Sequence, residues 1–379
     1  IDGLAFTQLE RAMEKNRLPF LKSLWKKEGY ELKPFYSGLP STTPAVQGEF
    51  YFGIPAAVPA FDFIRKEQQA RMVMLHPEAA DQIGRELADQ NPGLLKGGSS
   101  YSNIYSGGAE EARYCVQEMG LNSFWKATHP LNLALLFLIH ITKVFRIIMY
   151  GVIEFGVAVG DFFRSIFHRA HPLKELKFIF TRVAVCAVLR ELVRFRVKLD
   201  VSRGMRIIHA NFVGYDEQSH RRGPSSAFAH WSLRGIDEAI RDIYRTALRS
   251  DCRDYQLIVF SDHGQEGVDC YSDEYGISVR QAVNRVFASR FSGDPEENRR
   301  GRRHGRGRGF FSRHGSEWVG FLMFDSFQHV RTTSMVPLGH IYLPEKISDA
   351  EKEDYGRRLV KEAHIPLVLY SCGESTIGI

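Results

Sequence analysis

The chain has 379 residues, enough for one large α/β domain with insertions or for two domains. Hydrophobic residues make up 44% and charged residues 25%, a globular composition that can bury a sizeable core and excludes a wholly disordered chain. The formal net charge of +6 and the pI near 9.0 indicate anionic substrates or surfaces. The five cysteines are scattered and form no CxxC pair, so they do not define the redox compartment.

The first part of the chain predicts alternating helices and strands. Residues 6–25 carry apolar side chains at helical spacing, which predicts an amphipathic helix. Residues 30–36 alternate as in a strand, and residues 61–75 predict a strand or hairpin. We expect a first strand to precede Asp2 and the last strand, from Pro366, to leave the domain unclosed, so we expect a fragment of a longer protein.

A cluster of hydroxyl side chains, Ser41-Thr42-Thr43-Pro44, stands before a predicted helix. Proline is favoured at the first helical position, so Pro44 predicts a helix start with Thr43 as its N-cap. An oxyanion on Thr43 would be stabilised by the helix dipole and the free backbone N–H groups. Two interpretations are open at this point: Thr43 only caps the helix, or its hydroxyl takes part in chemistry.

Residues 113–200 predict a helical insertion that is partly basic and amphipathic. Charges interrupt the apolar stretch from 131 to 167 before it reaches the about 18–20 uninterrupted apolar residues of a simple membrane span. Residues 173–198 then mix lysine and arginine with phenylalanine, valine and leucine. Two interpretations stay open: residues 131–198 lie on an anionic membrane surface, or they form a cap whose apolar faces pack together.

The first of two acid and histidine pairs follows an expected buried strand. The apolar run 205–208 predicts a parallel strand, so Asp216 and His220 should lie just beyond its carboxyl end. In open α/β sheets, that edge is where ligands bind. A carboxylate and an imidazole four residues apart can meet one cation if the turn between them is helical.

The second pair follows the next expected strand. Residues 228–248 predict an amphipathic helix that packs back on the sheet, and residues 257–261 predict the strand to which it leads. Asp262 and His263 end that strand, and Gly264 suits the tight turn behind them. Two strands therefore deliver the oxygen and nitrogen ligands that a pair of metal ions requires to one edge of the sheet.

Four motifs together give a specific resemblance. They are Asp2-Gly3, the Ser-Thr-Thr-Pro segment at 41–44, Asp-x-x-x-His-x-x-Gly-Pro from Asp216, and Ser-Asp-His-Gly at 261–264. In this order the set resembles the alkaline phosphatase superfamily, and within it the type I phosphodiesterase and nucleotide pyrophosphatase branch. The resemblance implies a mostly parallel sheet sandwiched by helices.

The resemblance also implies a site. Thr43, preferred over Thr42, would be the nucleophile, and two divalent metal ions, with Zn²⁺ expected, would be the cofactors. One ion would be held by Asp2, Thr43, Asp262 and His263, and the other by Asp216 and His220 with a further histidine. That histidine is expected beyond Ile379, with His314 as the candidate inside this sequence. The family's usual asparagine after the nucleophile helix has no counterpart in residues 52–61.

The expected function is hydrolysis of a phosphoric ester, with a phosphodiesterase or nucleotide pyrophosphatase type of reaction through a phosphothreonine intermediate. The alternative is a phospho-head-group transferase, or a catalytically impaired superfamily member that binds anionic polymers or membranes through its basic segments. The arginine-rich stretch 292–316 suits polyanions, but it explains none of the Asp and His motifs, so nucleic acid is not expected as the main ligand.

The expected organisation follows from these motifs. A membrane-associated or extracytoplasmic location is favoured. Residues 1–112 are expected to form the first portion of the α/β core with the nucleophile, and residues 113–200 the helical insertion. Residues 201–379 are expected to form the second portion of the core, with the basic loop 292–316 and a truncated C-terminus.

Overall fold

The structure is a computed structural model that describes residues 1–65, 70–118, 188–268, 271–291, 330–335 and 338–379. The chain forms two compact units. The first consists of Ile1–Phe61 and Met74–Gly267, and the second of Asp62–Val73 and Val268–Ile379.

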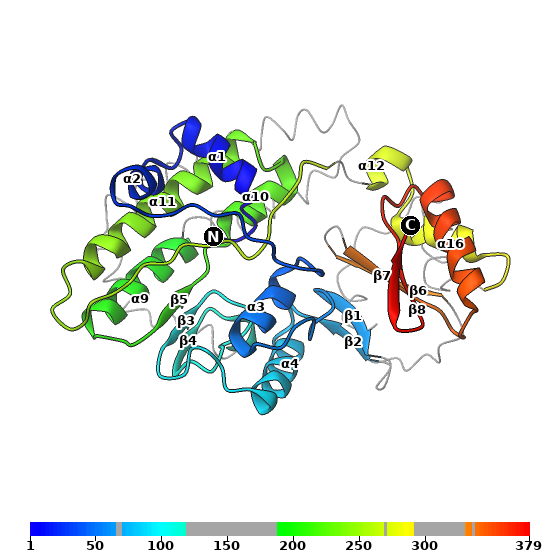
Figure 1. Ribbon diagram of the computed structural model, residues 1–379, viewed down its shortest axis with the longest axis horizontal. Helices are drawn as coiled ribbons and strands as arrows, with labels where there is room; N and C mark the ends of the chain where they lie inside the picture. The colour runs from blue at the N-terminus through cyan, green and yellow to red at the C-terminus, as the bar shows by residue number, and fades with distance from the viewer. Residues whose placement is uncertain (66–69, 119–187, 269–270, 292–329, 336–337) are drawn as a thin grey trace, which may run out of the picture. The chain divides into compact units, whose positions relative to one another are not determined.

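A three-stranded parallel sheet lies in the first unit (Figure 1). Its strands are β3 (Ser99–Tyr101), β4 (Glu111–Arg113) and β5 (Ile208–Ala210), in the order β4-β3-β5. The register pairs Ser100 with His209 and Tyr101 with Ala210. An α/β architecture with parallel strands is therefore confirmed, whereas strand β5 overlaps the run predicted at 205–208 only at Ile208.

Helices of the first unit surround this sheet. They are α1 (Phe6–Glu14), α2 (Pro19–Lys27), α3 (Thr43–Phe52), α4 (Pro77–Gln90), α9 (Arg190–Ser202), α10 (Gly214–Arg222) and α11 (Ala227–Ala247), with a 3-10 turn at Val116–Glu118. The helix predicted at 228–248 is confirmed as α11. The helix predicted at 6–25 is divided in two, because Asn16 has a left-handed φ of 54° and Pro19 has no N–H to continue the hydrogen-bond ladder.

Alternation along the strands sends side chains to two opposite layers of helices. Tyr101 packs in the core with residues of α9 and α11, and its hydroxyl donates to Asp200 of α9 at 2.5 Å. On the opposite face, His209 is hydrogen bonded to the hydroxyl of Tyr51 from α3. The sheet is thus covered on both faces. Helix α10 follows the carboxyl end of β5 in the chain.

Two predicted strands are wrong. Residues 30–36 and 257–261 are not part of any strand ladder. Leu257 and Val259 still pack against the core, while Ile258 is 72% exposed. The carbonyl of Phe260 accepts a hydrogen bond from the backbone nitrogen of Ile1 at 2.7 Å, and that of Phe212 accepts one from Asp2 at 3.2 Å. Segment 257–261 keeps the burial pattern of a strand without the paired backbone that defines one.

The second unit combines antiparallel strands with helices (Figure 1). Its described elements are β1 (Asp62–Arg65), β2 (Ala70–Val73), α12 (Tyr271–Tyr275), α13 (Val279–Phe287), β6 (Arg331–Met335), β7 (Leu338–Tyr342), α16 (Asp349–Glu362), β8 (Leu369–Cys372) and β9 (Ser375–Gly378). The hairpin predicted at 61–75 is confirmed as β1 and β2. The N-terminus of α13 carries a capping box of Ser278 and Gln281.

Most of the predicted insertion, residues 119–187, lies outside the described residues. In the part that is described, α9 buries Val193, Val197 and Val201 in the core of the first unit. Among the described helices, none has both the length and the apolar composition that crossing a membrane requires. The domain limits expected at 112 and 200, and the basic loop 292–316, stay predictions.

Candidate active site

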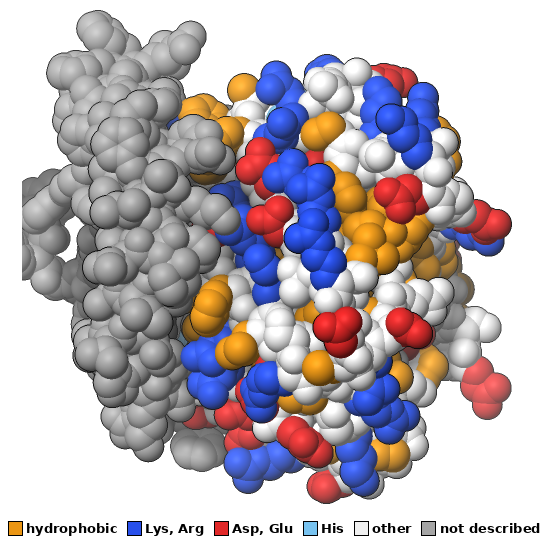
Figure 2. All heavy atoms as spheres, turned by 90° about the vertical axis from the view of Figure 1, so that its left-hand side faces the viewer, with side chains coloured by type: hydrophobic (Ala, Val, Ile, Leu, Met, Phe, Trp, Pro, Cys, Tyr) orange, Lys and Arg blue, Asp and Glu red, His pale blue; other side chains and the backbone are white. Residues whose placement is uncertain are grey.

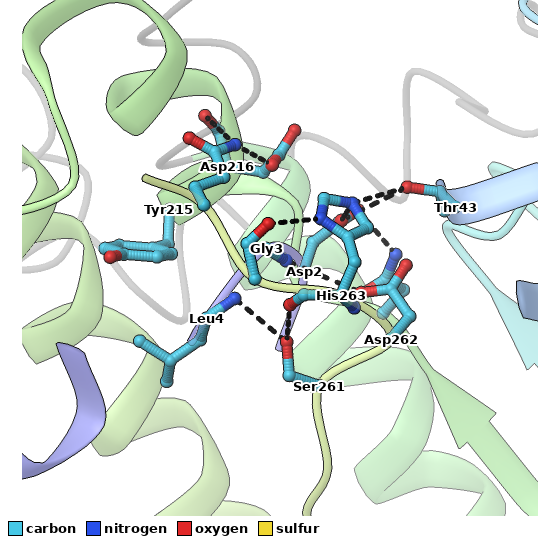
Figure 3. A network of polar contacts seen from close by, with 12 residues as sticks. Asp2, Gly3, Leu4, Thr43, Tyr215, Asp216, Ser261, Asp262 and His263 are labelled. Atoms are coloured by element: carbon cyan, nitrogen blue, oxygen red, sulfur yellow. Dashed lines mark hydrogen bonds and ion pairs between the residues drawn. The ribbon is translucent and has the colours of Figure 1, made fainter. Parts of the chain in front are cut away.

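Five of the predicted site residues lie close to one another near the carboxyl end of β5: Asp2, Thr43, Asp216, Asp262 and His263 (Figure 3). Asp2 lies beside this strand end, because its N–H donates to Phe212. Gly3 follows with a φ of 69°, a conformation that side chains rarely adopt. A Cβ at Gly3 would also collide with the carboxylate of Asp216. Glycine is therefore required at position 3, and Asp216 is brought against the backbone next to Asp2.

The turn with Asp262 and His263 is fastened to the start of the chain. The N–H of Leu4 donates to Ser261 Oγ at 2.9 Å, and Ser261 Oγ donates to the carbonyl of His263 at 2.6 Å. Asp262 Oδ1 accepts from the N–H of His263 at 3.1 Å and from that of Gly3 at 3.4 Å. These bonds hold Asp262 and His263 against Asp2, which explains how residues 260 positions apart form one cluster.

Thr43 enters this cluster from the start of α3. Its Oγ1 lies 3.1 Å from His263 Nε2 and 3.4 Å from Asp2 Oδ1. The predicted capping role is wrong, because helix α3 already includes Thr43 and its N-cap is Thr42, whose side chain makes no capping bond. Of the two adjacent threonines, the hydroxyl of Thr43 is the one that contacts the predicted ligands.

Asp2, Asp262 and His263 form a donor set that suits a divalent cation. Each offers one ligand atom, and these atoms lie within 4.8 Å of one another. Asp262 Oδ2 is buried and has no hydrogen-bond partner among the described residues, as expected of an oxygen that a cation would satisfy. His263 Nδ1 lies 3.1 Å from the carbonyl of Gly264, so Nε2, which faces Thr43 and Asp2, is the ring nitrogen that could be a ligand.

The second predicted pair lies on one face of α10. Asp216 Oδ2 and His220 Nε2 are 3.2 Å apart, one helical turn from each other. The turn between them is helical, as the prediction of a shared cation requires, and the binding of a cation by this pair stays a prediction. His314, the candidate third ligand inside this sequence, lies outside the described residues.

Burial and mutual charge shift the pKa values of this cluster. Burial, reinforced by the charge of Asp2, raises the pKa of Asp262 to about 6. Burial lowers the pKa of His263, but the hydrogen bond to Asp2 and the neighbouring carboxylates outweigh it and raise the pKa to about 10. The hydrogen bond to Asp216 raises the pKa of His220. Protons are thus held on the same atoms that a cation would use as ligands, so protons and a cation compete for these atoms.

Two carboxamides at the site were not predicted from the sequence. Asn211 Nδ2 donates to Asp2 Oδ2 at 2.8 Å, and Gln265 Nε2 donates to Asp216 Oδ1. Their signal in the sequence is weak: Asn211 follows an apolar run, where asparagine usually marks a turn, and Gln265 follows Gly264 without a recognisable pattern.

Comparison with known families tests the resemblance. Residues 178–352 match the family model of type I phosphodiesterase / nucleotide pyrophosphatase. That family is part of the alkaline phosphatase superfamily. The matched segment includes both acid and histidine pairs, whereas Asp2 and Thr43 precede it. No curated protein and no solved structure matches the chain. The family assignment supports a phosphoester hydrolase.

Proposed function

We propose that this protein is a metal-dependent hydrolase of phosphodiesters or nucleotide pyrophosphates that works through a phosphothreonine intermediate on Thr43. The observation that carries the proposal is the position of Thr43 Oγ1, 3.1 Å from His263 Nε2 and beside Asp2. A hydroxyl in such a cluster has the neighbours that an activated nucleophile requires.

The metal ligands follow from the same contacts. Asp2, Thr43, Asp262 and His263 would hold one divalent ion, with Zn²⁺ expected. Asp216 and His220 would hold the second, together with a histidine beyond Ile379 or, within this sequence, His314. Bound ions would lower the pKa of the hydroxyl and offset the negative charge of the phosphoryl group.

The protein's own groups account for the rest of the reaction. Thr43 Oγ1 would form a bond to phosphorus while the bond to the leaving oxygen breaks, and the hydroxyl proton would end on the leaving alcohol or phosphate. The resulting phosphothreonine still carries the other ester group. Water would then cleave the bond from Thr43 to phosphorus: its hydroxyl goes to the released monoester and its other hydrogen restores the Thr43 hydroxyl. Thr43 is the first residue of α3, so the attacked phosphoryl group would lie at the positive end of the helix dipole. Asp2 and His263 orient Oγ1 toward the substrate through their contacts with it.

The first test compares the two neighbouring threonines. With Zn²⁺ present, we expect Thr43→Ala to lower hydrolysis of bis(p-nitrophenyl) phosphate by more than about 10³-fold, as loss of a nucleophile does in other hydrolases. Thr42→Ala is the matched control: its hydroxyl is also buried and has no hydrogen-bond partner among the described residues. We expect it to retain most activity. Full activity in Thr43→Ala, or a loss confined to Thr42→Ala, would contradict the assignment.

A second test concerns the membrane-surface role of residues 131–198, which we propose as an addition to hydrolysis. Flotation with vesicles that contain anionic lipid would detect it. Binding that disappears at high salt would support it, because attraction of basic side chains to anionic lipid is screened. Absence of binding would favour the alternative that this segment is a helical cap.

A further inference from the structure

Two carboxylates of the candidate site, those of Asp2 and Asp216, share a pattern of hydrogen bonds. In Asp2, Oδ1 lies 3.3 Å from His263 Nε2 while Oδ2 accepts from Asn211. In Asp216, Oδ2 lies 3.2 Å from His220 Nε2 while Oδ1 accepts from Gln265. In both carboxylates, one oxygen faces an imidazole and the other receives the NH₂ group of a carboxamide.

We propose that Asn211 and Gln265 are positioning residues, each of which holds one oxygen of a ligand carboxylate so that the other oxygen faces the cation. This inference rests on the proposed function, since it assigns a role toward the metal ions. A free carboxylate can turn about its terminal torsion and offer either oxygen, or both, to a cation. A donor fixed on one oxygen removes that choice and presents a single ligand atom.

The chemistry of an amide suits this role better than a charged donor. An arginine or lysine at these positions would neutralise the carboxylate and weaken its attraction for a cation. The NH₂ group of asparagine or glutamine donates a hydrogen bond and adds no net charge. The carboxylate therefore keeps its full negative charge for the metal ion.

Each carboxamide is itself held in place. Asn211 is 7% exposed, and its backbone N–H donates to Tyr101 at 2.9 Å, so it is anchored at the end of the parallel sheet. Gln265 also lies 3.4 Å from the backbone carbonyl of Asp216, and it connects the turn after Asp262 to the first turn of α10. Loss of either side chain would leave a carboxylate free to rotate.

The test measures metal binding directly. Zn²⁺ affinity and stoichiometry would be measured by competition with a chromophoric chelator for the wild-type chain, Asn211→Leu and Gln265→Leu. Leucine keeps the approximate size of each side chain and removes the donor. We expect each variant to bind Zn²⁺ about 10–100-fold more weakly, the range for lost partners of metal ligands. Gln265 is half-buried, so its variant remains informative if Asn211→Leu does not fold.

Gln82→Leu is the matched control, because Gln82 also donates from a carboxamide to a carboxylate, that of Glu86 on α4, at 3.2 Å. We expect its affinity to equal that of the wild type. Wild-type affinity in both Asn211→Leu and Gln265→Leu would overturn the positioning role and leave the proposed hydrolase intact. A wild-type chain that binds no divalent ion would overturn both the metal dependence and this inference.

Discussion

His209 shows at the residue scale how burial determines a protonation state beside the site. It lines an apolar cavity of about 130 Å³ next to Asp262, stacks on Phe260 with ring centroids 5.6 Å apart, and is hydrogen bonded to Tyr51. Burial, with a smaller contribution from the positive charge at the amino terminus, lowers the pKa of His209 to about 3. The imidazole is therefore neutral at neutral pH, and protonating it opposes the folded state.

The lowered pKa of His209 predicts how the stability of the folded chain depends on pH. The pKa of His209 is lower in the folded chain than in the unfolded chain, so its contribution is complete above about pH 6.5 and is lost as the pH falls toward 3. Between pH 7 and 5, we expect the free energy of unfolding in urea to fall by about 2 kcal/mol from this group. His209→Gln stays neutral and should flatten the profile in that range; an unchanged slope would contradict the prediction.

At the scale of elements, a side chain of helix α11 caps the N-terminus of helix α2. Helix α2 has no side-chain cap of its own at its N-terminus. Asp237, on α11 and 1% exposed, accepts the N–H groups of Phe20 and Leu21 at 2.9 Å each. The two bonds satisfy donors that a helix start leaves unpaired, and the carboxylate lies at the positive end of the helix dipole. Asp237 thus connects α2 to the helix that packs against α9 and α10.

We expect Asp237→Ala to lower the free energy of unfolding by about 1–3 kcal/mol, because it leaves two backbone donors without a charged acceptor. Asp89→Ala, at an exposed position on α4, is the control and should change stability by less than about 0.5 kcal/mol. Chemical denaturation monitored by tryptophan fluorescence would measure both. Equal stability of the two variants would contradict the capping role.

At the scale of the whole molecule, the positive charge is unevenly distributed along the sequence. Over the face drawn in Figure 2, lysine and arginine side chains are interspersed with acidic and apolar ones. Residues 298–309, by contrast, contain six arginines and no acid, so their deletion would take the formal net charge from +6 to zero. This segment lies outside the described residues and contains none of the predicted site residues.

Deletion of residues 298–309 should therefore weaken the binding of polyanions without affecting the hydrolysis of phosphodiesters. We expect hydrolysis of a small phosphodiester to remain within about twofold of the full chain, because the proposed nucleophile Thr43 and both acid and histidine pairs lie in the first unit. Retention on heparin should shift to lower salt, since fewer cations contact the polyanion. Loss of hydrolysis in a variant with an unchanged melting temperature would show that the arginine-rich segment takes part in the reaction.

The sequence by itself determined the helices with a clear apolar period and the candidate residues of the site. Helices α11 and α13 and the hairpin β1-β2 follow from local patterns of burial and turns. The type and spacing of their side chains singled out the pairs Asp216 with His220 and Asp262 with His263, whereas Asp2 and Thr43 were implied as site residues by the family resemblance.

Tertiary structure decided what depends on partners distant in the chain. The segment 257–261 has the composition of a strand, yet a strand exists only where another backbone supplies its hydrogen bonds. The preference for Thr43 over Thr42 gained support from a contact in the structure, because the start of α3 places the Thr43 hydroxyl beside His263. Asn211 and Gln265 could not be found in advance, since a carboxamide acquires a role only through the carboxylate it reaches.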